Sequence, residues 1–303
     1  MYRIEGAIGK GLSRRNFLTG LGCTAGAAAA VMATGCSESA KMTTPNSPTS
    51  PAMNAAITDV DILNFALNLE YLEAEYYLRA TTGSGLSSSD IGSNAGAVTG
   101  GTQVPFKTPA IREVAMEIAN DEQAHVRFLR QALGASAVSR PALDFTDAFN
   151  AAASAAGIGY SFNPFVGEDQ FLIGAFVFED VGVTAYHGAA SLLTNATDLG
   201  AAAAIMAVEG YHAAAIRTLI VQLGSLFITL ANRISALRAT AGGGNETQVS
   251  AGTIAAADSN SIAFDRTTDE VLHIVYLDQM AGVVKNGGFF PNGLNGTITA
   301  TAS

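Results

Sequence analysis

Cysteine and tryptophan are scarce in this chain of 303 residues, which has two cysteines and no tryptophan. Both cysteines, Cys23 and Cys36, lie within the first 36 residues. The chain beyond them therefore offers no disulfide framework, no thiolate metal site and no cysteine nucleophile.

Basic residues are also few, because 16 Lys and Arg stand against 26 Asp and Glu and give a net charge of −10. Several of the basic residues lie before Cys36, and the others are scattered singly. Such a chain does not attract a phosphate backbone, so nucleic acid is excluded as a partner.

Long hydrophobic runs are missing from the chain that follows the N-terminal segment. The longest run there covers residues 218–232 and has only 15 residues. A membrane-spanning helix needs about 20 apolar residues, so we expect contact with a membrane only through a lipid anchor. Hydrophobic residues nevertheless make up 49% of the chain and charged residues 14%, which is enough for a sizeable buried core.

Residues 1–35 have the features of an export signal. Arg14 and Arg15 precede an apolar run rich in Ala and Gly, an arrangement that resembles the twin-arginine signal. The run ends in Ala-Thr-Gly before Cys36, which resembles a lipoprotein processing box; cleavage without lipidation is the alternative. We expect a location in the periplasm, either free or anchored to the membrane through a lipidated Cys36, with residues 36–57 as a flexible tether.

Apolar residues recur with a helical period in four long segments, which predict an all-α chain. The four predicted helices cover residues 58–81, 108–133, 168–193 and 198–223. The long connection 135–167 would join two helical hairpins as a crossover. Residues 224–303 form a C-terminal extension, with predicted helices near 225–239 and 267–279 and a turn-rich tail, 286–296, that we expect to be a packed cap.

Carboxylates occur inside apolar helices, where an ionised side chain is costly unless it is paired or bound to a metal. Glu122 and Glu209 are each followed three residues later by a histidine, His125 and His212. Residues three apart share one face of a helix, so each Glu-x-x-His motif directs an oxygen and a nitrogen to one point.

The other two long helices each carry a glutamate followed seven residues later by a tyrosine, Glu70 with Tyr77 and Glu179 with Tyr186. The chain is thus a duplicated unit, in which Glu-x6-Tyr on one helix precedes Glu-x2-His-x4-Arg on the next. Each motif alone is weak, but their alternation over four helices indicates one common site.

This alternation resembles the ferritin-like dinuclear-metal carboxylate superfamily, which implies a four-helix bundle over residues 58–223. The segment Leu-Glu-Tyr-Leu-Glu at 69–73 and the Gly-Gly-Phe-Phe-Pro-Asn-Gly tail resemble exported ferritin-like proteins related to plant desiccation-associated proteins. The resemblance implies Glu122 and Glu209 as ligands that bridge two ions. The full ligand set that it implies is Glu70, Glu122, His125, Glu179, Glu209 and His212.

The charge of such a site supports two metal ions independently, because four converging carboxylates repel each other and two divalent ions neutralise them. Ligation by oxygen and imidazole without thiolate suits Fe or Mn. Loss of the metal, which would leave two buried Glu–His pairs, is the alternative.

We therefore expect a dinuclear Fe or Mn centre that reacts with dioxygen or hydrogen peroxide, as a ferroxidase, peroxidase or catalase in stress protection. The competing interpretation is a protein without enzymatic activity, whose metal stabilises a structural or desiccation-related module. An iron-storage cage is less favoured, although a homo-oligomer is compatible with the sequence.

Several further polar residues have more than one interpretation. Glu73 shares the inner face with Glu70, so we consider it as an extra ligand, a substitute ligand, a proton relay or a carboxylate at the rim. Tyr77 and Tyr186 are either core tyrosines or donors to the ligand carboxylates.

The remaining motif residues are expected to be structural. We expect Arg130 and Arg217 to form surface or interhelical salt bridges. Glu270 and His273 repeat the Glu-x-x-His spacing without partner helices, so we expect them on the wall of an amphipathic helix. His187 points away from the inner face and is expected to be a core or supporting histidine.

Overall fold

The computed structural model describes residues 57–278 and 282–302. The predicted export signal, Cys36 and the tether up to residue 56 lie outside the described residues.

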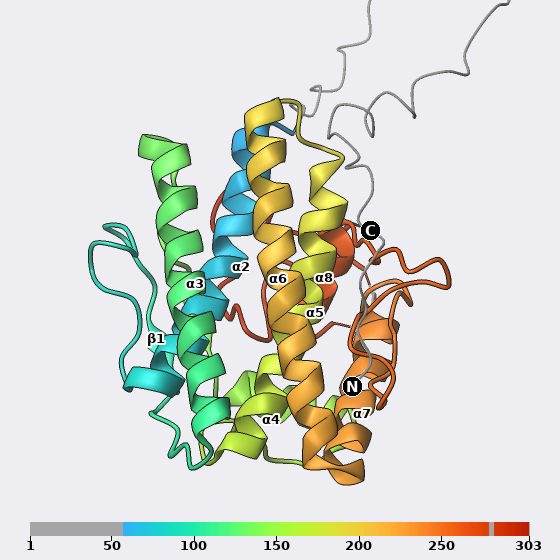
Figure 1. The fold of residues 1–303 in the computed structure, drawn as a ribbon. Coiled ribbons are helices and arrows are strands. Elements are labelled where there is room, and N and C mark those ends of the chain that lie inside the picture. Colours follow the sequence, from blue (N-terminus) through green and yellow to red (C-terminus); the bar gives the residue numbers. More distant parts are fainter. Residues whose placement is uncertain (1–56, 279–281, 303) are drawn as a thin grey trace, which may run out of the picture. The chain divides into compact units, whose positions relative to one another are not determined.

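Four long helices form the core of the described chain (Figure 1). They are α2 (Asp59–Thr82), α3 (Pro109–Leu133), α5 (Glu168–Ala190) and α6 (Ala196–Leu223). Helix α2 packs along α3 and α5 packs along α6, with contacts from α2 to α5 and from α3 to α6 that close the bundle. The predicted all-α bundle of two hairpins is confirmed.

Helix ends follow local capping. The Thr58 side chain accepts from the Asp61 backbone in a capping box, and Gly83 ends α2 with a φ of 80° that favours glycine. Helix α5 ends three residues before the predicted Leu193, because the Asp59 carboxylate accepts from the backbone nitrogens of the α5–α6 turn. Asn195 then caps α6, which begins at Ala196, two residues before the predicted start at Asp198.

The connections hold the only strands in the described residues, β1 (Val98–Thr99) and β2 (Leu143–Asp144), which pair in parallel. With two residues each, they are too short to produce an alternating pattern in the sequence. The crossover between α3 and α5 also contains the turn η1 (Gly134–Ser136) and helix α4 (Asp147–Ala155).

The C-terminal extension packs on α5 through α7 (Ser225–Ala241) and α8 (Thr268–Tyr276). A buried ion network joins it to the bundle, since Arg238 contacts both Asp180 of α5 and Glu246. Arg266 contacts Glu246 as well. Phe289 and Phe290 of the tail are buried, so this segment packs against the core.

The two duplicated arginines occupy corresponding places. Arg217 is fully buried and pairs with Asp180 of α5 at 2.8 and 2.9 Å, an interhelical salt bridge rather than a surface one. Arg130 instead donates to the Tyr71 hydroxyl of α2 at 2.6 Å, so the salt bridge expected for it is absent among the described residues. The two arginines have different partners because the residue after Glu70 on α2 is Tyr71, whereas the residue after Glu179 on α5 is Asp180.

One helix in the described part of the chain, α6, is long and apolar enough to cross a membrane by length and composition. The same test is passed by the core helices of proteins that never enter a membrane. Here α6 packs along α5 and carries the buried Glu209, His212 and Arg217.

Candidate metal centre

The six residues expected as ligands all lie inside the bundle and face one another. Helices α2 and α5 each contribute one glutamate, and α3 and α6 each contribute a Glu-x-x-His pair. The four glutamates are at most 1% exposed and the two histidines at most 8%. Their side chains are therefore withdrawn from water almost completely.

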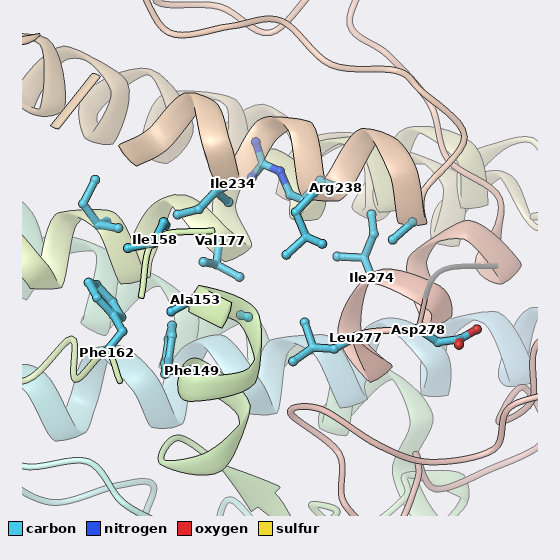
Figure 2. Close-up of a pocket in the computed structure, with 14 residues that line it drawn as sticks. Phe149, Ala153, Ile158, Phe162, Val177, Ile234, Arg238, Ile274, Leu277 and Asp278 are labelled. Carbon is cyan, nitrogen blue, oxygen red and sulfur yellow. The ribbon is translucent and has the colours of Figure 1, made fainter. Parts of the chain in front are cut away.

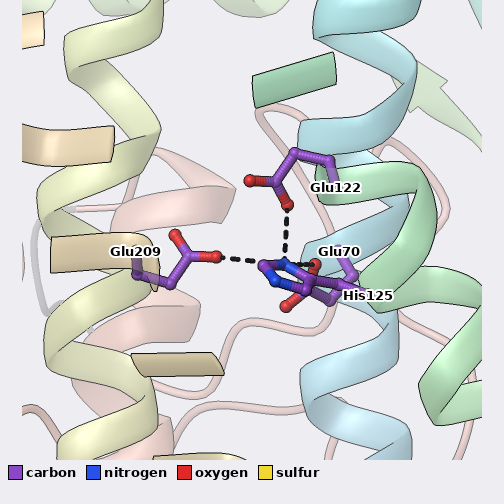
Figure 3. A group of neighbouring side chains, drawn as sticks. All are labelled: Glu70, Glu122, His125 and Glu209. Atoms are coloured by element: carbon purple, nitrogen blue, oxygen red, sulfur yellow. Dashed lines mark ion pairs between the residues drawn. The ribbon is translucent and has the colours of Figure 1, made fainter. Parts of the chain in front are cut away.

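The donor atoms form two overlapping groups, and within each group they lie within 4.8 Å of one another. One group is Glu70, Glu122, His125 and Glu209 (Figure 3). The other is Glu122, Glu179, Glu209 and His212. Glu122 and Glu209 belong to both groups, which is the geometry required of bridging carboxylates.

The same nitrogen of both imidazoles, Nδ1, faces the carboxylates. His125 Nδ1 lies 3.2 Å from Glu70 Oε2 and 3.5 Å from an oxygen of both Glu122 and Glu209 (Figure 3). His212 Nδ1 lies 3.0 Å from Glu122 Oε1 and 3.5 Å from Glu179 Oε2.

Eight buried donor atoms at this centre lack a hydrogen-bond partner among the described residues. They are Glu70 Oε2, Glu122 Oε1 and Oε2, His125 Nδ1, Glu179 Oε2, Glu209 Oε1 and Oε2, and His212 Nδ1. Buried polar atoms are nearly always paired, so a concentration of this kind is what a site for cations would show. Carboxylate oxygens and imidazole nitrogens are suitable ligands for divalent Fe or Mn, so the residues present fit such ions.

Without cations, the centre retains protons. Burial, with the nearby charge of Glu122, raises the pKa of Glu70 to about 7. Burial and the same neighbour raise the pKa of Glu209 well above its usual range. Burial also acts on Glu122, but the close imidazoles of His125 and His212 outweigh it and lower the pKa of Glu122 to about 2.

The histidines respond to the same carboxylates in the opposite sense. Burial alone would lower the pKa of His212, but the Glu179 and Glu122 carboxylates outweigh it and raise that pKa to about 12. Metal binding therefore has to displace protons from the site.

Two tyrosines hold the carboxylates of Glu70 and Glu179, the two candidate ligands that belong to one group only and are called the outer carboxylates below. The Tyr77 hydroxyl donates to Glu179 Oε1, and the Tyr186 hydroxyl donates to Glu70 Oε1. Each tyrosine thus bonds the glutamate of the other helix, not the one seven residues before it, because α2 and α5 run antiparallel here. The second oxygen of each carboxylate is left facing the centre.

Glu73 lies one turn after Glu70 and is only 4% exposed. Its counterpart on α5 is Gly182, where a β-carbon would lie 3.3 Å from Glu73 Oε1 and 2.6 Å from Glu209 Oε2. The glycine therefore leaves room for both carboxylates. Burial and the charge of Glu209 raise the pKa of Glu73 well above its usual range.

Asp121 is a supporting residue that the sequence motifs do not identify. Its Oδ2 lies 3.2 Å from Nε2 of His212, on the side of the ring away from the carboxylates. A carboxylate in this place fixes the orientation of a ligating imidazole. Asp121 directly precedes Glu122, but the contact crosses from α3 to α6 and only packing creates it.

Other histidines serve the scaffold. Glu270 caps α8 by accepting from the Thr267 backbone, while His273 Nδ1 lies 2.8 Å from Asp278. The third Glu-x-x-His pair therefore does not converge on one point. His187 Nδ1 contacts the Phe264 carbonyl at 3.0 Å and so links α5 to the C-terminal extension.

Comparison with known proteins agrees with this architecture. Residues 58–222 match the family model of the ferritin-like domain. The chain is 29% identical over 242 residues to the desiccation-related protein PCC13-62 of Craterostigma plantagineum, which covers 71% of this chain and 76% of the relative. It is 27% identical over 270 residues to the ferritin-like catalase Nec2 of Nesocodon mauritianus, with 79% and 84% covered.

Proposed function

Since the chain belongs to the ferritin-like domain family, we propose that its bundle holds two Fe or Mn ions and uses them to convert hydrogen peroxide into water and dioxygen. The convergence of eight buried, unpaired donor atoms from four helices carries this proposal. The similarity to a ferritin-like catalase favours peroxide over other oxidants.

Each group of ligands would hold one ion. Glu70 and His125 would bind the first, Glu179 and His212 the second, and Glu122 and Glu209 would bridge them. Two divalent ions carry the charge that balances four carboxylates. When bound, such a pair supplies the two-electron redox chemistry that peroxide disproportionation needs.

The protein side chains position this chemistry and exclude water from it. Tyr77 and Tyr186 fix the outer carboxylates, and Asp121 accepts at Nε2 of His212 so that Nδ1 remains directed inward. Disproportionation of two peroxide molecules transfers two protons from one to the other. Glu73, a buried carboxyl beside Glu209, is placed to hold a proton at Oε1 during this transfer.

The test is to load the full chain anaerobically with Mn(II) or Fe(II), measure bound metal, and follow dioxygen release from hydrogen peroxide with an oxygen electrode. We expect about two ions per chain. Replacing both bridges, Glu122→Gln with Glu209→Gln, is expected to abolish metal retention and dioxygen release. Glu117→Gln is the matched control, since Glu117 lies on α3 but is exposed. Equal metal content in the bridge variant and the control would contradict the proposal.

A structural metal is the second candidate. The near-complete burial of every ligand and the similarity to a desiccation-related protein favour it. A tightly held metal that raises the melting temperature while no dioxygen is released would support this function instead.

We further propose that the protein acts outside the cytoplasm, free in the periplasm or anchored through Cys36. The paired Arg14 and Arg15 before an apolar run support this location.

A further inference from the structure

Two apolar cavities lie end to end between the bundle and the C-terminal extension. The outer cavity, of about 30 Å³, is bounded by Phe149 of α4, Ile234 of α7 and Leu277 after α8 (Figure 2). The inner cavity, of about 20 Å³, lies against α2, α5 and the tail. Val177 and Ile274 line both cavities and so form the wall between them.

The inner cavity lies beside the candidate metal centre, although none of the six candidate ligands lines it. Glu73 and Gly182 both line it. A β-carbon at Gly182 would contact Oε2 of Glu209, a residue that belongs to both ligand groups. Because position 182 has no side chain, only the Glu73 carboxylate stands between the inner cavity and the candidate ligand Glu209.

The outer cavity approaches the surface. Ile158, Phe162 and Leu237 line it and are partly exposed, whereas Val177 and Ile274 are buried. The two cavities thus lie one after the other between the partly exposed edge of the bundle and the buried Glu73.

The chemistry of the lining selects what can pass. Apart from Glu73 at the inner end and Arg238 and Asp278 in the outer cavity, the lining is hydrocarbon and backbone. A buried apolar cavity stays dry and accepts small apolar guests. Hydrogen peroxide would lose its hydrogen bonds to water there, whereas dioxygen has none to lose.

We propose that these cavities are a passage for dioxygen between the surface and the metal centre, with Val177 and Ile274 as its constriction. The role of the passage rests on the proposed function, in which dioxygen is the product of peroxide disproportionation and has to leave the centre. Occupancy by dioxygen does not depend on that function.

The first experiment measures occupancy in the metal-free full chain. Dissolved dioxygen is paramagnetic, so it speeds the relaxation of methyl groups that it approaches. We expect at least about threefold greater enhancement at the Val177 and Ile274 methyls than at Ile216 and Ile220, which are fully buried but line neither cavity. Equal enhancement at all four residues would overturn the proposal.

The second experiment uses two variants at the constriction. Val177→Phe narrows the passage and Val177→Ala widens it, while both remove native packing. In the Fe(II)-loaded protein mixed with dioxygen, we expect Val177→Phe to slow oxidation about tenfold and Val177→Ala to leave it as fast or faster. A loss of stability alone would move both rates in one direction, and that result, or unchanged rates in both, would overturn the passage.

The two experiments separate the passage from the catalytic proposal. If the wild-type protein binds metal but releases no dioxygen from hydrogen peroxide, the proposed function fails. In that case the methyl relaxation alone decides whether dioxygen enters the cavities.

Discussion

At the scale of single residues, the centre consists of carboxylates and imidazoles that are buried from water but whose inward-facing atoms have no hydrogen-bond partner among the described residues. Glu122 stays ionised beside two imidazoles, while Glu70 and Glu209 hold their protons more tightly than exposed carboxyls do. The metal-free protein is therefore a protonated form of the site, and its stability depends on pH.

We predict that the metal-free protein becomes less stable as pH rises from 5.5 to 8. The folded chain keeps a proton on Glu70 up to about pH 7, whereas the unfolded chain loses it near 4.5. His212 adds to the decline above pH 6.5, because its folded pKa is raised to about 12. The free energy of unfolding should fall by about 2–4 kcal/mol across this range.

Urea unfolding of the metal-free chain at several pH values measures this dependence. Added Mn(II) should stabilise the protein more at pH 8 than at pH 5.5, because fewer protons remain to be displaced. A metal-free protein that gains stability as pH rises from 5.5 to 8 would contradict the prediction.

The duplicated arginines provide a matched pair of substitutions. Arg217→Met leaves Asp180 buried with only Arg238 as its ionic partner, so we expect a loss of about 3–5 kcal/mol. Arg130→Met removes a bond to the neutral Tyr71 hydroxyl, for which we expect about 1–2 kcal/mol. Chemical denaturation compares the two, and equal losses would show that the ionic partner is not the cause.

At the scale of elements, α2 and α5 exchange hydrogen bonds across the centre. Tyr77 of α2 holds Glu179 of α5, and Tyr186 of α5 holds Glu70 of α2. In this antiparallel pair, each outer carboxylate is therefore oriented by a hydrogen bond from a tyrosine of the other helix.

We predict that Tyr77→Phe and Tyr186→Phe each weaken metal binding about 10–100-fold, because each removes the bond that orients a ligand. Tyr76→Phe is the control. Its hydroxyl is also buried but donates to the Phe171 carbonyl at 2.8 Å, away from the ligands. Competition with a metal chelator measures the affinities, and a Tyr76→Phe variant as weak as the other two would indicate general loss of packing instead.

At the scale of the whole molecule, the C-terminal extension completes the bundle rather than merely following it. It supplies Arg238 to the buried Asp180 and contributes to the lining of both apolar cavities, of which the inner one lies beside Glu73. For the N-terminal segment, the sequence alone predicts a separate role in export.

We predict that replacing Arg14 and Arg15 by lysines causes the protein to accumulate in the cytoplasm, because the twin-arginine pattern is the proposed export signal. Cell fractionation with immunoblotting measures this. Cys36→Ala is the companion variant. It should leave export intact but move the protein from the membrane fraction to the soluble periplasmic fraction, and unchanged membrane association would contradict lipidation.

The sequence by itself determined the all-α fold, the approximate helix boundaries and the set of six residues that meet. The helices and the two Glu-x-x-His pairs depend on local periodicity, since a Glu and a His three residues apart share a helix face wherever the helix lies. Glu70 and Glu179 were added by the alternation of motifs over four helices and by the resemblance to the ferritin-like superfamily. Only the tertiary structure decided that Tyr77 bonds Glu179, that Asp121 supports His212, that Arg217 is buried with Asp180, and that Gly182 leaves an opening beside Glu73. Those relations cross between helices, and they depend on how two surfaces pack, which no single helix encodes.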